Sequence, residues 1–416
     1  MKGVIFIKAK TKTYVLVTVF LIAVFSFSFY VLRDTAGIPA PEEPVIPPPE
    51  SGIADTPDEL NTVQYPSDPA GGQSPVTPPG NPTQESTDAD GEGGASATPG
   101  EEPEDQEEPE EVPDAPVTVT ISAVGDITLG GDPRGSNNFI REFEHNDGDY
   151  GYFLRNVRYI FEEDDLTVAN LEGALTDATS HAEKTYVMRG PPHFTAILSS
   201  SGVEAVTLAN NHSKDFFERG YTETIESLEA SGVMYFGNES NTILEINGIR
   251  VGLFGYLLWY GGRSQERLIS ASIGDLKERG AQLIIAYYHW GTELNNIPDS
   301  YQRALGRFSI DSGADLVLGA HPHVLQGIEE YNGRYIVYSL ANFCFGGNNN
   351  PQDQDTFIFQ QTFTFEEGVL LDVNEINIIP AFVSSERGRN NFQPTVAEGD
   401  DAERILERIR NYSERL

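Results

Sequence analysis

The hydrophobic pattern of the chain changes period repeatedly after residue 116. Short apolar or alternating runs predict strands at residues 117–124, 166–169, 203–208, 233–236, 281–288 and 314–318. Between them, apolar positions spaced three and four residues apart predict helices at residues 152–163, 193–201, 221–230, 269–279 and 301–312. Strands that alternate with helices in this way are typical of parallel strands joined by helical crossovers.

Antiparallel pairing is also indicated. Asn247-Gly248 and Asn332-Gly333 are two-residue hairpin turns, and they would join residues 242–246 to 249–256 and residues 327–331 to 334–340. Residues 357–365 and 369–379 read as further antiparallel strands, and residues 400–415 as a closing helix. We therefore predict an α/β (α+β) domain with two mixed sheets packed face to face and covered by helices, rather than one doubly wound sheet.

An uncharged apolar run of 19 residues lies near the start of the chain, at residues 14–32, after four lysines and no acid. As a helix it would reach roughly 28 Å, enough to cross the hydrocarbon core of a bilayer. Because positively charged flanks stay inside, we predict a cytoplasmic tail at residues 1–13, a single-pass signal anchor at residues 14–32, and the rest outside a bacterial cell membrane. Small residues at 35–40 leave cleavage of the segment as the alternative.

Residues 34–116 differ sharply in composition from the rest of the chain. They hold 21 acidic residues, no Lys or Arg, and 18 of the chain's 26 prolines. Such a segment cannot bury enough apolar surface to offset the entropy of ordering it, so we predict a disordered acidic linker. It would span about 50 Å as a flexible coil and at most about 250 Å when extended, so it can hold the domain away from the membrane.

The remaining domain, residues 117–416, is acidic. It carries 43 acidic and 22 basic residues, which gives a net charge of −21. This charge disfavours nucleic acid as a partner, because neutralising phosphates requires clustered Lys and Arg. The single cysteine, Cys344, allows no intrachain disulfide, and no histidine adjoins it in sequence to activate it as a nucleophile.

Six short motifs carry residues suited to metal binding or proton transfer, and each follows an apolar run. They are Gly125-Asp126, ANLEG from residue 169, LANNH from 208, YHWGTE from 288, GAHPH from 319 and SLANF from 339. Four of the seven histidines fall within them. Because the carboxyl ends of parallel strands meet at one edge of a sheet, we expect the motifs to converge on a single site.

Each motif alone has an ordinary structural explanation. Asp126 would suit a turn, Glu172 the first turn of a helix, and His289, among aromatic residues, a hydrogen-bonded core position. Asp215, three residues after His212, is expected to cap the following helix rather than to orient that histidine. The placement of all six motifs at strand ends nevertheless favours a site over coincidence.

In their order the motifs resemble those of the bacterial capsule-synthesis family typified by CapA, which is associated with poly-γ-glutamate. The resemblance runs from about residue 118 to about residue 381. That family is similar in turn to calcineurin-like metallophosphoesterases, so the resemblance implies a four-layer αββα sandwich with a two-metal site. The implied catalytic residue is His212, as the proton donor. The implied metal ligands are Asp126, Asn170, Glu172, Asn211, His289, His321 and His323, and Asn210, Glu293 and Asn342 are predicted to contact substrate.

The chain departs from the phosphoesterase pattern in three places. Thr128 stands where a first-strand histidine ligand is usual, Asn170-Leu171-Glu172 replaces a Gly-Asp-x-x-Asp motif, and Ala341 replaces a glycine. One cation position is therefore short of ligands, so both one and two ions remain open. The mixed oxygen and nitrogen donors favour Mn, Fe or Zn over Mg or Ca.

Two functions follow from these expectations. In the first, the protein hydrolyses a phosphoester or amide in a cell-surface polymer. In the second, it is a non-catalytic assembly or export subunit for an anionic polymer such as poly-γ-glutamate and works with other capsule-synthesis membrane proteins. Its acidic surface would then need local compensation, for which Arg189, Arg263 and Arg267 are the candidates. A lectin-like wall-binding module is least favoured, because it leaves the histidines unexplained.

Overall fold

A computed structural model describes residues 115–136 and 138–416. The predicted tail, the predicted anchor and the predicted linker up to residue 114 lie outside the described residues. Within the described part, no helix combines the length and the apolar character needed to span a bilayer.

The first sheet combines parallel strands with an antiparallel extension. Within the described residues it has eight strands in the order β16-β15-β14-β1-β2-β5-β6, with β13 also paired to β1. Its parallel strands are β1 (Val117–Thr128), β2 (Leu166–Leu171), β5 (Ala205–Thr207), β6 (Met234–Phe236) and β13 (Asn342–Phe345). The antiparallel extension consists of β14 (Asp355–Glu366), β15 (Val369–Phe382) and β16 (Thr395–Val396).

The second sheet is also mixed and has six strands among the described residues, in the order β11-β12-β10-β9-β8-β7. Both predicted hairpins form, as β7 (Thr242–Ile246) with β8 (Ile249–Leu258) and as β11 (Ile328–Tyr331) with β12 (Arg334–Val337). Between them lie β9 (Leu283–Trp290) and β10 (Leu316–Ala320), which run parallel to β8 and β12. A separate short ribbon joins β3 (Ala174–Leu175) to β4 (Arg189–Gly190).

The two sheets pack face to face. Ile121 and Val168 of the first sheet share one fully buried core with Leu253 and Ile285 of the second. Each such side chain contributes roughly 1.5–3 kcal/mol through its removal from water. The phenol of Tyr287 adds a polar link between the sheets, because it donates a hydrogen bond to the carbonyl of Val124 at 2.6 Å.

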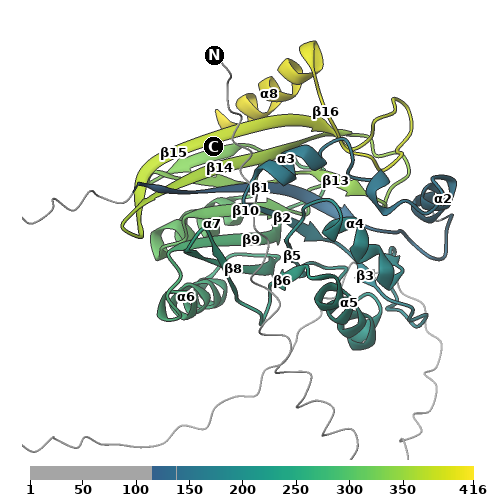
Figure 1. The fold of residues 1–416 in the computed structure, drawn as a ribbon, viewed down its shortest axis with the longest axis horizontal. Helices are drawn as coiled ribbons and strands as arrows, with labels where there is room; N and C mark the ends of the chain where they lie inside the picture. Colours follow the sequence, from purple (N-terminus) through teal and green to yellow (C-terminus); the bar gives the residue numbers. More distant parts are fainter. Residues whose placement is uncertain (1–114, 137) are drawn as a thin grey trace, which may run out of the picture. The chain divides into compact units, whose positions relative to one another are not determined.

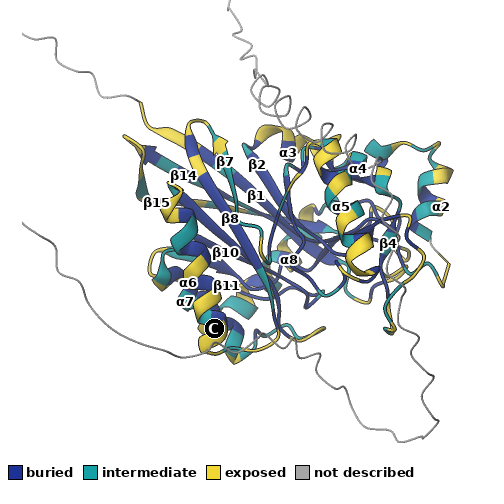
Figure 2. Cartoon of the chain, turned by 90° about the horizontal axis from the view of Figure 1, so that it is seen from below, coloured by how far each residue is buried: buried dark blue, intermediate teal, exposed yellow. Residues whose placement is uncertain are grey.

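Helices cover both outer faces (Figure 1). The outer face of the first sheet packs against α2 (Asn138–His145), the 3-10 turns η1 (Tyr150–Tyr152) and η2 (Pro192–Phe194), α3 (Arg158–Glu163), α4 (Thr195–Ser199) and α5 (Phe217–Ser231). The outer face of the second packs against α6 (Arg263–Glu278) and α7 (Ser300–Ser312). Figure 2 shows buried strands between helices whose outward faces are exposed. The predicted αββα sandwich is confirmed.

The last helix, α8 (Gly399–Ser413), contacts β15 of the first sheet and β11 of the second. Its Ile405 and Ile409 are buried in the core between the sheets. The amphipathic pattern at the end of the chain therefore produces a helix that closes the sandwich along one edge.

Several predicted boundaries are wrong because tertiary packing overrides local pattern. The helix predicted at residues 152–163 begins only at Arg158, since Phe153 before it is buried and stacks on Phe139 of α2 at 4.1 Å between ring centroids. The helix predicted at residues 193–201 is the short pair η2 and α4, and the strand predicted at residues 334–340 ends at Val337. The pattern also missed α2, β3, β4, β13 and β16.

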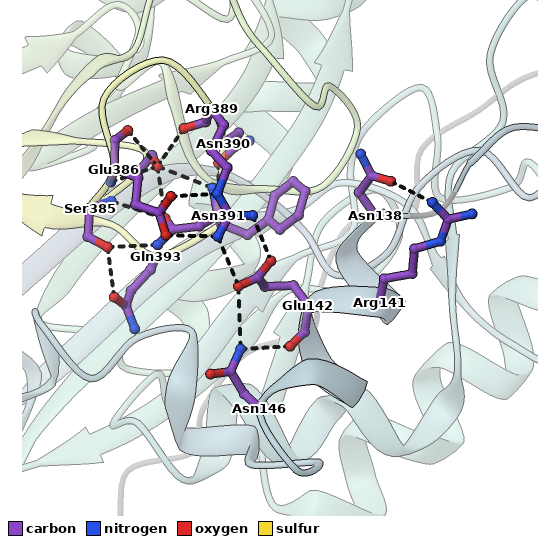
Figure 3. Close-up of polar contacts among 12 residues, drawn as sticks. Asn138, Arg141, Glu142, Asn146, Ser385, Glu386, Arg389, Asn390, Asn391 and Gln393 are labelled. Carbon is purple, nitrogen blue, oxygen red and sulfur yellow. Dashed lines mark hydrogen bonds and ion pairs between the residues drawn. The ribbon is translucent and has the colours of Figure 1, made fainter.

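A polar clasp holds α2 to the loop after β15 (Figure 3). Glu142 of α2 accepts hydrogen bonds from the guanidinium of Arg389 at 3.0 Å and from the phenol of Tyr152 at 3.0 Å. In the same loop, Asn390 donates its side-chain amide to the carbonyl of Phe345 at 2.9 Å. Because Phe345 is the last residue of β13, the clasp fixes the strand that carries Asn342.

Candidate metal centre

Strand ends from both sheets meet at one rim. Asp126, at the end of β1, lies in register with Asn170 of β2 and Asn342 of β13. On the second sheet His289, near the end of β9, lies in register with Ala320, the last residue of β10. The predicted convergence of strand ends therefore occurs.

Asp126 connects the two sheets. Its side chain is fully buried and accepts a hydrogen bond from the amide of Asn170 at 2.8 Å. Its other oxygen lies 3.0 Å from Nδ1 of His323, which follows β10, and 3.4 Å from the backbone nitrogen of His321. A carboxylate held in this way presents oxygens to a shared interior space rather than to solvent.

His289 is fully buried between amide groups. The side-chain amide of Asn170 lies 3.2 Å from Nδ1 of His289, and Nε2 lies 2.9 Å from Oδ1 of Asn211. The side-chain amides of Asn170 and Asn211 therefore hold the imidazole at its two nitrogens. Oε1 of Glu172 lies 3.6 Å from Nε2.

Glu172 is the group that lacks partners. Both carboxylate oxygens are buried and neither has a hydrogen-bond partner, and the same is true of Nδ1 of His321 and Oγ1 of Thr128. Leaving a buried acceptor unpaired costs about 1–3 kcal/mol, and more for a charged group. A cation among these atoms would satisfy them, so the residues present fit a metal ion.

Burial and the charges of neighbouring groups shift the pKa values of four residues in the cluster. Burial raises the pKa of Glu172 to about 8, and the charge of Asp126 adds to the rise. Burial lowers the pKa of His289 well below its usual value and that of His321 to about 4, and neighbouring histidines add to both shifts. For His323, burial acts to lower the pKa, but Glu172 and Asp126 outweigh it and raise it to about 10. His289 and His321 are therefore neutral at pH 7, as metal ligands must be, whereas His323 and Glu172 would each lose a proton on binding an ion.

Three overlapping sets of side chains could each hold an ion. In every set the three potential ligand atoms lie within 4.8 Å of one another; the sets are Glu172 with His289 and His321, Asp126 with Glu172 and His323, and Glu293 with His321 and His323. Glu172 belongs to two of them, so this carboxylate is common to two of the candidate sets. The backbone is strained here, because His321 and His323 both have positive φ angles, of 96° and 57°.

His212 lies beside the metal-type cluster but belongs to none of these sets. Its Nδ1 lies 2.6 Å from Oδ2 of Asp215, which also accepts the backbone N–H of Met188 at 2.7 Å. The expectation that Asp215 caps a helix is wrong: α5 begins at Phe217 without a side-chain cap, and Asp215 orients the imidazole instead. Buried Asp215 is compensated by Lys184, whose ammonium lies 2.7 Å from Oδ1.

The three predicted substrate contacts lie at the same rim. Asn210 donates its side-chain amide to Oδ1 of Asn170 at 3.0 Å and is buried. Asn342 places its Oδ1 2.9 Å from Nδ1 of His323. Glu293 is exposed and reaches the cluster through His321 and His323.

The structure thus gathers every predicted site residue into one network; their roles as ligands, proton donor and substrate contacts remain predictions. Two neighbours were missed. Lys184 lies in the loop between β3 and β4, where no motif signals it. Trp259 contacts His321 edge to face at 4.9 Å between ring centroids. Trp259 could have been found from the sequence, because it is an aromatic residue shortly after the end of a predicted strand.

The fold is an αββα sandwich with a buried cluster of histidines, carboxylates and amides at its strand ends. This combination places the chain among α/β domains that carry a candidate metal-binding site between two sheets. The family model for the bacterial capsule synthesis protein PGA_cap matches residues 120–347. This is more than half of the chain, so the protein belongs to that family, and the resemblance noted in the sequence is confirmed.

Two curated relatives support the assignment. The chain is 28% identical over 286 residues to the capsule biosynthesis protein CapA of Bacillus anthracis. The matched region covers 62% of this chain and 67% of that protein. It is 27% identical over 249 residues to the PGA biosynthesis protein CapA of Bacillus subtilis (strain 168). That match covers 55% of this chain and 63% of the relative. The chain therefore spans about two thirds of the length of these relatives.

Among solved structures, a hypothetical protein from Thermus thermophilus matches with a TM-score of 0.40 and 17% identity. The match covers 63% of this chain and 99% of that one. The protein TT1561 of the same organism matches with a TM-score of 0.36 and 12% identity, over 63% of this chain and 99% of that chain.

Proposed function

We propose that this protein is a metal-dependent hydrolase that acts on a cell-surface polymer during capsule synthesis. The observation that carries the proposal is the buried carboxylate of Glu172, which has no hydrogen-bond partner and lies close to His289, His321 and His323. Membership of the capsule-synthesis family supports the polymer as the setting. The basic segment and apolar run at the amino end support a membrane-anchored protein whose domain works outside the cell.

Seven residues would hold one or two divalent cations of the Mn, Fe or Zn type: Asp126, Asn170, Glu172, Asn211, His289, His321 and His323. A cation held there would lower the pKa of a water and polarise a phosphoryl or acyl oxygen of the substrate. Asp126 and Glu172 also supply negative charge that favours cation binding.

His212 would move the proton. Its Nδ1 is held by Asp215, so Nε2 faces away from that carboxylate and, in the doubly protonated imidazolium, would donate to a leaving group. Asp215 fixes the ring's orientation, and Lys184 keeps Asp215 in place through a second contact, with its ammonium 2.7 Å from the carbonyl of Asn211. The catalytic group and a candidate ligand are thereby locked to each other.

The test combines metal analysis with turnover on the full chain in mild detergent. We expect bound Mn, Fe or Zn by elemental analysis and hydrolysis of bis(p-nitrophenyl) phosphate or of a γ-glutamyl amide. His212→Ala should keep its metal and lose about a hundredfold or more in turnover, the usual contribution of a general acid.

Two results would count against the proposal in different ways. Bound metal with no turnover of any phosphoester or γ-glutamyl substrate would favour the assembly or export subunit. Turnover unchanged in His212→Ala would reject the proton-donating role while leaving the metal centre intact.

A further inference from the structure

Two adjacent aromatic side chains stand exposed at the end of β8. Trp259 is 46% exposed and Tyr260 57% exposed, whereas Trp290, the chain's other tryptophan, is fully buried. Single exposed apolar residues are common on protein surfaces. Trp259 differs from an isolated surface residue, because its indole contacts His321 of the candidate metal cluster and leaves aromatic area exposed beside it.

The indole lies directly beside the cluster. Its ring centroid is 4.9 Å from that of His321, and the two planes meet at 77°. His321 in turn lies 4.6 Å from His289 between centroids. A molecule that covered Trp259 would therefore lie next to the buried imidazole of His321.

The loop that carries Trp259 and Tyr260 is held by contacts with α7. The phenol of Tyr301, on α7, donates to the carbonyl of Leu258 at 3.2 Å and accepts the backbone N–H of Gly291 at 2.6 Å. A side chain at Gly261 would approach Cβ of Tyr301 to 3.1 Å, so the turn lies close against α7. The rings thus sit on a preorganised base, which reduces the entropy lost on binding.

The other side of the rim offers a carboxylate and an apolar side chain. Exposed Glu293 shares a ligand set with His321 and His323. Leu294 is 65% exposed, and its backbone N–H donates to the carbonyl of Pro322, between those histidines, at 2.8 Å. Flat aromatic faces beside an acceptor for hydroxyl groups suit a polyol, since a sugar ring has an apolar C–H face and an edge of hydroxyls.

We propose that Trp259 and Tyr260 form a carbohydrate platform on which a sugar ring of a glycan stacks, with Glu293 accepting hydrogen bonds from its hydroxyls. This inference rests on the proposed function and names its substrate class: the polymer presented to the metal centre contains sugar rings. An acidic polypeptide fits the platform less well, because Glu293 would repel its carboxylates and a domain charge of −21 would add to the repulsion.

Intrinsic fluorescence provides the test, because Trp259 is exposed and Trp290 is buried. Acrylamide should quench the Trp259 emission of the full chain in detergent. Hexasaccharides of glucose, galactose and N-acetylglucosamine serve as probes, beside a poly-γ-glutamate oligomer. We expect at least one hexasaccharide to shield the quenchable emission. Shielding by none of them, or by poly-γ-glutamate alone, would overturn the proposal.

Variants separate the platform from the metal centre. For the hexasaccharide that shields best, calorimetry should show Trp259→Ala losing about tenfold or more in affinity, as removal of one stacking ring does, and Trp259→Phe losing less. Tyr159→Ala, on α3, removes an aromatic ring of similar exposure, 54%, and should bind normally. All three variants should keep the metal content of the parent. Normal glycan binding by Trp259→Ala would refute the platform. A parent protein that binds no metal would refute only the proposed hydrolase.

Discussion

Lys184 shows, at the scale of a single residue, what the motifs could not reveal. Asp126, His289, His321 and His323 were predictable because strand ends converge and their side chains bind metals. Lys184 belongs to no such pattern: it lies in a loop and reaches Asp215 and Asn211 only through its long side chain. Contacts of that kind depend on tertiary placement, so sequence spacing does not encode them.

Replacing Lys184 with methionine should weaken metal binding. The change removes the ammonium from Oδ1 of the buried Asp215 and from the carbonyl of Asn211, so both neighbours of His212 become free to shift. Loss of a group that orients a ligand typically costs about 10–100-fold in metal affinity. Titration of the metal-free protein with Zn²⁺ or Mn²⁺ would measure the loss.

Two variants control this experiment. Lys184→Arg keeps a donor and should recover part of the affinity. Lys214→Met removes an exposed lysine paired with Glu218 at 2.7 Å and should bind as the parent does, because surface ion pairs contribute little. Parent-like metal affinity in Lys184→Met would show that Lys184 does not position the site.

Most secondary-structure elements and both hairpins followed from the sequence, but the pairing of the other strands did not. The strands of β9 and β10 are continuous apolar runs, which a sheet buried on both faces produces. By contrast, β13 was missed because it is short and begins with the polar Asn342, and it pairs with β1 only near Asp126 and Thr128. Its position depends on the chain coming back from more than two hundred residues away, which no local pattern reports.

Gly125 is the residue that lets these segments approach. A Cβ there would stand 1.8 Å from the carbonyl oxygen of Ala341 and 2.9 Å from that of Leu340. The next residue, Asp126, donates its backbone N–H to Ala341 at 2.9 Å. The close contact therefore places the first candidate ligand, and it explains why a glycine precedes that aspartate.

Gly125→Ala should destabilise the domain by about 3 kcal/mol or more, since backbone atoms on both sides must move apart. Gly274→Ala is the matched control: it lies inside α6 with nothing within 4 Å of the added methyl, and should stabilise by about 1 kcal/mol. Chemical denaturation of both variants beside the parent would measure the two free energies of unfolding. A loss below about 1 kcal/mol for Gly125→Ala would mean that β1 and the Ala341 segment separate easily.

For the whole molecule, the candidate centre is a junction between the two sheets. Asp126 and Asn170 come from the first sheet. His289 comes from the second sheet, and His321 and His323 follow strand β10 of that sheet. The sequence predicted both the sandwich and this convergence, because strand alternation and motif order are properties of the chain. The substrate depends on the shape and chemistry of the rim, where Trp259, Tyr260 and Leu294 come from loops that no periodicity describes.

Metal removal should therefore loosen the sandwich as a whole. An ion that binds only the folded state at 100 times its Kd adds about 2.7 kcal/mol, which for a domain of this size raises the melting midpoint by about 4 °C. We expect the midpoint of the parent to fall after chelation with EDTA and to recover when Mn²⁺ or Zn²⁺ is returned. Glu172→Gln should abolish this shift, because it removes the carboxylate common to two of the ligand sets. Glu226→Gln, an exposed change on α5, should leave the shift intact. Identical midpoints with EDTA and with saturating metal would show that no cation joins the two sheets.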